Sequence, residues 1–235
     1  MSTNAQPQPY GRGHRALEIA SIAFVFLALG WLGFRIFQAV TGPRGLVFTI
    51  LASVTGYLVA DFLSGVVHWA GDTIGDQNTP IFGPNFVTPF RYHHVDPKDI
   101  TRHDFIETNG NNCIVVAPVL ALLLLVIPKT TGWFFYGCVT MVFTSWFVFL
   151  TNQFHRWAHE DNPARWIRAL QRAGLILSPE HHSIHHAAPQ DKSYCITVGW
   201  MNPLLEKIRF FRFCEAAISR IHPGALRPDR PIGNG

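Results

Sequence analysis

The chain has 235 residues, of which 48% are hydrophobic and 14% are charged, and its formal net charge is +4. Soluble domains usually carry about 25% charged residues, so this chain has too few to cover a water-facing surface of ordinary size. Its basic residues are scattered rather than gathered into one run, which argues against a nucleic-acid-binding protein.

The two ends of the chain are predicted to be tails. Residues 1–16 are expected to form a disordered N-terminal tail, because most of them are polar and include several proline and glycine residues. No small-residue cleavage site follows a short apolar region, so we expect no signal peptide. Residues 17–220 are predicted to form one membrane domain, and residues 221–235, rich in proline and glycine, a flexible C-terminal tail.

Four apolar runs follow one another, at residues 19–34 with an extension to residue 40, 46–67, 113–127 and 133–150. A helix needs about 20 apolar residues to cross the hydrocarbon of a membrane. The third run is shorter, so its helix is either buried among its neighbours or extends back into the preceding polar segment. Core helices of a soluble protein are the alternative, but four such runs with so little charge favour membrane spans.

Lysine and arginine residues predict the orientation of these spans. The N-terminus, the 68–112 loop and everything after residue 151 lie on one side and hold 16 of the 19 basic residues, and the other side holds Arg35, Arg44 and Lys129. Cytoplasmic segments carry an excess of basic residues, so both termini are expected in the cytoplasm. The predicted fold is an all-α, multi-pass integral membrane protein with four transmembrane helices and a cytoplasmic histidine-rich helical cap.

The segment 163–177, after the fourth span, mixes apolar residues such as Trp166 and Ile167 with Arg165, Arg168 and Arg172. This pattern suits a helix that lies on an anionic membrane face. An ordinary amphipathic helix packed on the domain fits it equally well.

Ten of the 12 histidines fall into four groups, and the predicted topology places all four on the cytoplasmic side. Imidazole groups this close together are typical of metal sites rather than of an apolar core. The orientation was derived from lysine and arginine alone, so the agreement supports a metal centre at the membrane surface. The groups are His68; His93, His94 and His103; His155 and His159; and His181, His182, His185 and His186.

The first group lies at the end of the second span. Asp61, His68 and Asp72 share one helix face, so His68 and Asp72 can point at one metal ion. Asp61 sits about two turns deeper, where an ionisable residue is costly and usually functional. We expect Asp61 either to accept a hydrogen bond from a ligand imidazole or from water, or to pair with a polar group of the bundle.

The second group follows in the loop between the second and third spans. His93 and His94 are adjacent, so on a helix they point about 100° apart and cannot both be ideal ligands of one ion. One of them is therefore expected to support a ligand rather than to bind metal. Asp104, directly after His103, is a candidate to orient that imidazole or to join the coordination.

The other two groups contain helical pairs. His155 and His159 are spaced i, i+4 on an extension of the fourth span, with Asn152 on the same face as a further candidate catalytic residue. The 181–186 segment gives two more i, i+4 pairs, His181 with His185 and His182 with His186. A surface tract that binds metal adventitiously is the alternative, but such tracts are usually of low complexity.

The number of candidate ligands exceeds what one tetrahedral zinc ion needs, so we predict two metal ions that share eight or nine ligands. Imidazole suits zinc, copper, iron and nickel alike. Iron is favoured because the oxidation of an unactivated C–H bond of a lipid needs an oxygen-activating centre. The chain has no HExxH, GxSxG or GxxxxGK[ST] motif, which leaves zinc-protease, serine-hydrolase and P-loop functions without support.

The histidine layout is similar to that of membrane desaturases and hydroxylases, with their HxxxH and HxxHH boxes. Five segments resemble more closely the CarF-like lipid desaturases, the plasmanylethanolamine desaturase family, and the likeness extends over residues 61–213. These segments are 91–97 (RYHHVDP), 100–110 (ITRHDFIETNG), 151–159 (TNQFHRWAH), 181–186 (HHSIHH) and 195–207 (CITVGWMNPLLEK).

The resemblance implies a diiron enzyme that uses dioxygen and two electrons to remove hydrogens from C1 and C2 of the 1-O-alkyl chain of an ether phospholipid. The product is the vinyl ether of a plasmalogen. The chain has no haem, flavin or iron–sulfur motif, so the electrons would come from a cytochrome b5-like or ferredoxin-like protein. The resemblance carries over the ligands His68, Asp72, His94, His103, His155, His159, His182, His185 and His186, with His93 and His181 as further candidates.

The same residues are also compatible with other functions. The same centre could desaturate an acyl chain or hydroxylate a lipid. A non-enzymatic membrane protein that binds or senses a metal such as zinc is the alternative outside catalysis, although sensing seldom needs ten histidines on rigid helices.

Overall fold

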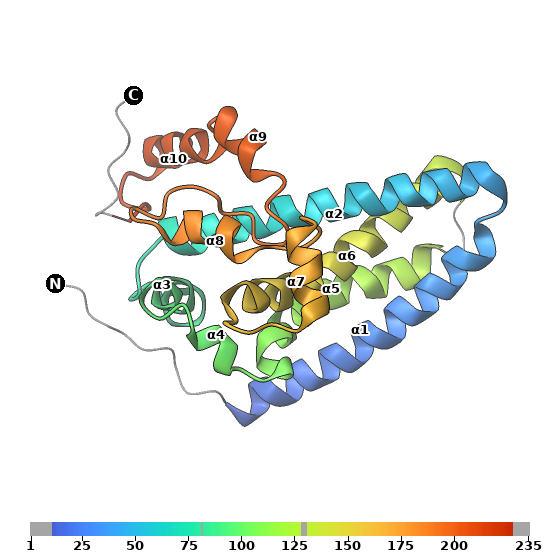
Figure 1. Cartoon of the computed structure of the whole chain (residues 1–235), viewed down its shortest axis with the longest axis horizontal. Coiled ribbons are helices and arrows are strands. Elements are labelled where there is room, and N and C mark those ends of the chain that lie inside the picture. Colours follow the sequence, from blue (N-terminus) through green and yellow to red (C-terminus); the bar gives the residue numbers. More distant parts are fainter. Residues whose placement is uncertain (1–10, 81, 128–130, 228–235) are drawn as a thin grey trace.

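A computed structural model of the chain describes residues 11–80, 82–127 and 131–227. Four long helices run alongside one another in a bundle (Figure 1). They are α1 (Arg12–Ala39), α2 (Gly42–Thr73), α5 (Phe105–Val126) and α6 (Gly132–His159). Each is long and apolar enough to cross a membrane, which confirms the four predicted spans. The short third run extends back to Phe105, as one of the two alternatives predicted.

The bundle is held by apolar side chains and by close backbone contacts. Leu32 of α1, Leu120 of α5 and Val139 of α6 are fully buried in its main core. A Cβ atom at Gly56 of α2 would lie 2.8 Å from the backbone of α6 at the Thr140 carbonyl oxygen. Glycine at this position therefore lets α2 and α6 approach closely, as small residues do between membrane helices.

Short helices form a cap at the end of the bundle where α2 and α6 finish and α5 begins (Figure 1). Between α2 and α5 lie the π-helix η1 (Gly83–Val87), α3 (Thr88–Val95) and α4 (Asp99–Arg102). After α6 come α7 (Arg165–Arg172), α8 (Pro179–His186), α9 (Asn202–Lys207) and α10 (Phe210–Ile221).

The structure corrects the predicted boundaries of both tails. Helix α1 begins at Arg12, so residues 12–16 are helical, and Arg15 of this first turn forms an ion pair with Asp104. Near the C-terminus, the backbone N–H of Arg227 donates to the Thr73 carbonyl, 2.9 Å away, which ties this segment to the end of α2. The predictions for residues 1–10 and 228–235 lie outside the described residues.

The predicted 163–177 helix is shorter than expected. Helix α7 ends at Arg172, and Gly174 follows with a φ of 65°, a left-handed conformation that ends helices. Ile167 and Ile176 pack with Tyr57 of α2 and Phe154 of α6, so one face of this segment is packed on the domain.

A buried, non-helical segment, residues 193–199, passes beside α2. Asp61 accepts hydrogen bonds from the backbone of this segment and of the residue pair that follows it. Its Oδ1 accepts from the N–H groups of Val198 and Gly199 at 2.9 Å, and its Oδ2 accepts from that of Met201 at 3.0 Å. Backbone outside a helix needs such partners near the hydrocarbon, where water cannot satisfy it. Of the two predicted roles of Asp61, these contacts fit the pairing with a polar group of the bundle, because backbone amides donate to both of its oxygens.

Replacement of Asp61 should destabilise the protein. Asp61→Ala leaves three backbone N–H groups without an acceptor, and we expect a loss of about 3 kcal/mol or more at roughly 1 kcal/mol for each bond. Thermal or SDS-induced unfolding of the purified protein measures the change. Ser64→Ala is the control and should cost less, because it leaves only one backbone N–H group, that of Ile196, without its acceptor, besides removing the bond from Ser64 Oγ to the Asp61 carbonyl. Equal losses in the two variants would contradict the assigned role of Asp61.

Candidate metal centre

The first of two neighbouring groups of ligand atoms is organised around Asp72. Asp72 Oδ1 lies 3.0 Å from His94 Nε2, and Asp72 Oδ2 lies 3.6 Å from His68 Nε2 and 3.3 Å from His185 Nε2. Helix α2 supplies His68 and Asp72, α3 supplies His94 and α8 supplies His185. We call these residues the Asp72 group, and all four ligand atoms lie within 4.8 Å of one another.

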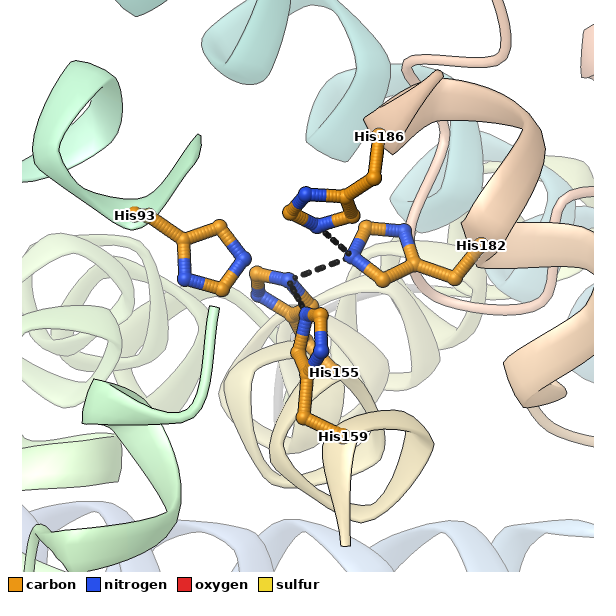
Figure 2. A group of neighbouring side chains, drawn as sticks. All are labelled: His93, His155, His159, His182 and His186. Atoms are coloured by element: carbon orange, nitrogen blue, oxygen red, sulfur yellow. Dashed lines mark hydrogen bonds between the residues drawn. The ribbon is translucent and has the colours of Figure 1, made fainter. Parts of the chain in front are cut away.

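The second group contains only histidines, His93, His155, His159, His182 and His186, whose ligand atoms also lie within 4.8 Å of one another. Figure 2 shows their rings turned toward a common centre from α3, α6 and α8. The Nε2 atoms of His155 and His182 are 2.8 Å apart, those of His159 and His155 are 3.2 Å apart, and those of His186 and His182 are 2.9 Å apart. We call this the five-histidine group.

Helical geometry divides neighbouring histidines between the two groups. His182 and His186 are spaced i, i+4 and reach the five-histidine group, whereas His185 between them reaches the Asp72 group. The adjacent His93 and His94 are divided in the same way. The prediction that both cannot bind one ion is consistent with this division, but each contributes to a separate group, and neither is reduced to a supporting role.

The donor set fits metal cations. A neutral imidazole nitrogen is either a donor or an acceptor, so His155 Nε2 and His182 Nε2, each with two imidazole neighbours, would need shared hydrogen bonds. A cation at the centre accepts all these lone pairs at once. The buried His93 Nε2, His185 Nε2 and Asp72 Oδ2 atoms have no hydrogen-bond partner among the described residues, which is expected for atoms that serve as metal ligands.

Two features prepare the imidazoles for binding. The Nδ1 atom of His185 lies 2.8 Å from the Lys192 carbonyl, which can only accept, so Nδ1 carries the proton and Nε2 presents its lone pair. Burial lowers the pKa of His93 and His182 well below the usual range, and it lowers the pKa of His186 to about 3. A lowered histidine pKa favours the neutral form, which is the form that binds metal.

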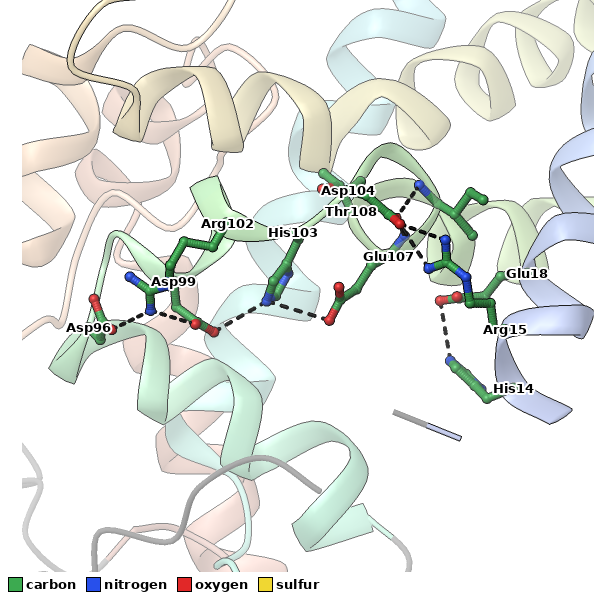
Figure 3. A network of polar contacts seen from close by, with 11 residues as sticks. His14, Arg15, Glu18, Asp96, Asp99, Arg102, His103, Asp104, Glu107 and Thr108 are labelled. Atoms are coloured by element: carbon green, nitrogen blue, oxygen red, sulfur yellow. Dashed lines mark hydrogen bonds and ion pairs between the residues drawn. The ribbon is translucent and has the colours of Figure 1, made fainter. Parts of the chain in front are cut away.

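His103, a predicted ligand, lies outside both groups in a separate polar network (Figure 3). Its Nε2 atom is 3.3 Å from an Asp99 oxygen and 3.6 Å from a Glu107 oxygen. His103 directly follows the short helix α4 and these carboxylates hold its ring, so it does not reach the centre.

Asp104, predicted as catalytic, has a structural role in the same network (Figure 3). It caps α5, because its side chain accepts the N–H groups of Ile106 and Glu107 at 3.0 Å, and it pairs with Arg15 of α1 at 2.6 Å. The hydrogen bond from Arg15 is the main cause that lowers the pKa of Asp104 to about 2. The carboxylate therefore joins α1 to α5.

Two more predicted site residues also lie apart from the ligand atoms. His181 Nε2 accepts a hydrogen bond from Asn202 Nδ2 at 3.0 Å and packs against Gly199, so it supports the buried 193–199 segment. Asn152 is half-buried and lies outside both groups, one helical turn deeper in the bundle than His155.

Sequence reasoning missed two contacts of the centre. The Tyr194 ring is fully buried, and its centroid lies 5.2 Å from that of His185 and 6.1 Å from that of His68. The Lys192 carbonyl that orients His185 is a backbone atom, so residue identity carries no signal for it. Tyr194, nine residues after His185, likewise belongs to no motif that would mark it in the sequence.

Residues 57–227 match the family model described as a lipid desaturase domain. The chain is 46% identical over 213 residues to the plasmanylethanolamine desaturase of Myxococcus xanthus, with 90% of this chain and 74% of the relative covered. It is 46% identical over 188 residues to plasmanylethanolamine desaturase 1 of Mus musculus, with 77% of this chain and 68% of the relative covered. It is also 36% identical over 171 residues to the chloroplastic fatty acid desaturase 4 of Arabidopsis thaliana, with 70% and 50% covered. No solved structure matches.

The two groups predict the metal content of single variants. The wild-type protein should hold about two transition-metal ions per chain, and His182→Ala or Asp72→Ala should each lower this to about one, because each removes a ligand from one group. Elemental analysis of the purified protein measures the ratio. His103→Ala and His181→Ala are the matched controls and should keep both ions. A loss of metal in these controls equal to that in His182→Ala would overturn the assignment of ligands.

Proposed function

This chain belongs to the lipid desaturase family, and we propose that it forms the vinyl ether double bond of plasmalogens from 1-O-alkyl ether phospholipids. The observation that carries the proposal is the convergence of nine ligand side chains on two neighbouring groups at one end of a four-helix membrane bundle. The relatives named plasmanylethanolamine desaturase, which match most of the chain, support the choice of substrate.

We infer that the two groups hold a pair of iron ions. The donors are eight imidazoles and one carboxylate, and none of them is a thiolate. Such donors suit iron among other metals, and the oxidation of an unactivated C–H bond is what requires a metal that activates oxygen. Bound iron would supply this oxygen chemistry. Overall, the substrate loses two hydrogen atoms from adjacent carbons, and dioxygen with two further electrons and two protons becomes two molecules of water.

The protein's own residues position the ligands and exclude water. His68, His182 and His185 are at most 2% exposed, so bulk water does not reach them. His68 lies 26 residues after the start of α2, about 39 Å along the helix axis, which exceeds the roughly 30 Å of hydrocarbon. The centre thus lies beyond the hydrocarbon, at headgroup level. A target bond beside the ether oxygen, close to the glycerol, needs only a short displacement of the lipid to reach it.

The proposal includes an external electron donor and a cytoplasmic site. The chain carries no haem, flavin or iron–sulfur motif, so a cytochrome b5-like or ferredoxin-like protein would deliver the electrons. The excess of basic residues on the side of the cap supports a cytoplasmic location for the cap and both termini.

A second candidate function is the desaturation of an acyl chain near its carboxyl end. The similarity to fatty acid desaturase 4 favours it, since that relative is named for a fatty acid substrate. The bond beside an ester carbonyl would lie at the same depth as the bond beside an ether oxygen. A lipid hydroxylase on the same ligands would differ in its product, which gains one oxygen atom.

Lipid analysis tests the reaction. In a host with alkyl-ether phospholipids but no plasmalogens, supplied with a compatible electron donor, the wild-type chain should produce acid-labile vinyl ethers only in the presence of oxygen. His185→Ala should abolish the product, because it removes an oriented ligand of the Asp72 group. His103→Ala is the control and should retain most of the wild-type yield, because its ring lies outside both groups.

The chemical nature of the product distinguishes the candidate functions. A new acyl double bond that resists acid would indicate that the substrate is an acyl lipid and not an ether lipid. A gain of one oxygen atom would indicate a hydroxylase. Unchanged lipids in the presence of oxygen and donor would contradict an enzymatic function.

The orientation has its own test in bacteria. Green fluorescent protein fused to the C-terminus should fluoresce, and alkaline phosphatase at the same position should be inactive, because the first folds in the cytoplasm and the second outside it. Insertion of the same reporters between α1 and α2, at Val40–Thr41, should reverse both results. An active C-terminal phosphatase would overturn the cytoplasmic orientation and leave the metal centre unaffected.

A further inference from the structure

Helix α7 (Arg165–Arg172) has no part in the metal centre, and it lies across the bundle where the long helices meet the cap (Figure 1). Its inner face is packed: Ile167 is 4% exposed, and the Gln171 side chain donates to the Trp157 carbonyl of α6 at 3.2 Å. Its outer face is polar and open, with three exposed arginines, Arg165, Arg168 and Arg172, at helical spacing. We call these three residues the arginine face.

The depth of this segment follows from its contact with α2. The Tyr57 hydroxyl donates a hydrogen bond to the Leu175 carbonyl, three residues after α7 ends. Tyr57 lies 15 residues after Gly42, about 22 Å along α2 from its start, whereas the hydrocarbon is roughly 30 Å thick. By this measure the Tyr57 contact with Leu175 lies about 8 Å inside the hydrocarbon edge on the side of the cap. Long arginine side chains can extend over such a distance toward the headgroups while their aliphatic stems stay among apolar groups.

Exposed aromatic and apolar residues mark the same level. Trp166 of α7 is 56% exposed and stacks edge-on against Trp157, with ring centroids 5.1 Å apart. Trp200 is 46% exposed and lies 5.7 Å from the Tyr57 ring. Leu175 is 47% exposed. Tryptophan and tyrosine are enriched where a membrane protein passes through the lipid headgroups, so this surface continues the lipid-facing belt of the bundle.

The positive charge of the arginine face is available to a partner. The acidic residues just before α7 are engaged by other cations: Asp161 pairs with Lys98, and Glu160 pairs with Arg156. The ion pairs in the described part of the chain include none of the three arginines. Their guanidinium groups match the geometry of phosphate oxygens.

We propose that the arginine face binds the headgroups of anionic phospholipids in the leaflet next to the cap, with Trp166 inserted among them. The charge of the face complements an anionic surface, and the neighbouring Leu175 and Trp200 place it in contact with lipid. A soluble acidic protein fits less well, because it cannot reach exposed apolar residues at the depth of Tyr57. The binding site is separate from the metal centre, since Trp157 and Phe154 contact α7 from a different face of α6 than His155 and His159.

The test uses the full-length protein in nanodiscs that contain phosphatidylcholine and a minor fraction of phosphatidylglycerol. Mass spectrometry of the lipids retained after mild detergent extraction should show enrichment of phosphatidylglycerol. The triple variant Arg165→Gln, Arg168→Gln, Arg172→Gln should reduce this enrichment by at least about fivefold, since each basic residue near the surface contributes about that factor. The triple variant with lysine at the same positions should retain most of it.

A second measurement locates the contact. Brominated lipids quench nearby tryptophan, so the difference in fluorescence between wild type and Trp166→Phe should fall more with brominated phosphatidylglycerol than with brominated phosphatidylcholine. The glutamine triple variant should lose this preference, while its metal content shows that the fold is intact.

Three results would overturn the proposal. One is equal quenching of the Trp166 signal by the two brominated lipids. Another is an equal loss of enrichment in a charge-matched variant of residues 207–220, Lys207→Gln, Arg209→Gln, Arg220→Gln, which would make net charge the cause. The third is unchanged lipid retention in the glutamine triple variant, together with a higher concentration of electron-donor protein needed for turnover. That result would indicate that the arginine face binds the donor protein.

Discussion

The mutual proximity of unprotonated imidazole nitrogens is the constraint on which the rest of the structure depends. Within the five-histidine group, Nε2 atoms approach one another to 2.8 Å, and the surroundings are too buried for water to separate them. Hydrogen bonds among neutral imidazoles would have to be shared between neighbours, whereas one cation at the centre accepts all of the lone pairs. Three separate helices, α3, α6 and α8, must therefore be fixed in position before an ion can bind this group. The long helices, the cap and the buried segment serve this placement.

Rigid attachment of the cap to the bundle fixes the ligand-bearing helices in position. Helix α8 carries ligands of both groups, yet it is short and lies far from α2 in the sequence. The segment that follows it is held against α2 by Asp61 and Ser64, and Thr197 meets Thr151 of α6 with hydroxyl oxygens 2.7 Å apart. These bonds satisfy non-helical backbone at a depth where water is scarce. Polar residues inside the spans thus hold the cap, and the histidines at the ends of the same helices bind the metal.

The membrane gives this arrangement its functional meaning. Since α2 and α6 extend past the thickness of the hydrocarbon, their last turns place the ligands at headgroup level, where the first carbons of a lipid chain lie. Tyr57 and the aromatic residues around it lie about 16 Å below His68 along α2, within about 8 Å of the hydrocarbon edge. Under the proposed function, contacts with lipid there would fix the height of the whole cap, and with it the depth at which a lipid chain is oxidised.

The sequence by itself determined the four spans, the all-helical class, the presence of a histidine-rich centre with enough candidate ligands for two metal ions, and the family. These features are local: apolar length sets a span, and i, i+4 spacing sets which side chains of one helix share a face, as for His155 with His159 and His182 with His186. Only the tertiary structure decided which faces meet. It divided His93 from His94, excluded His103 and His181 from the ligands, and made Asp61 and Asp104 structural residues. Such outcomes depend on the rotation of each helix about its axis and on the path of the chain between helices, and residue spacing within one segment contains neither.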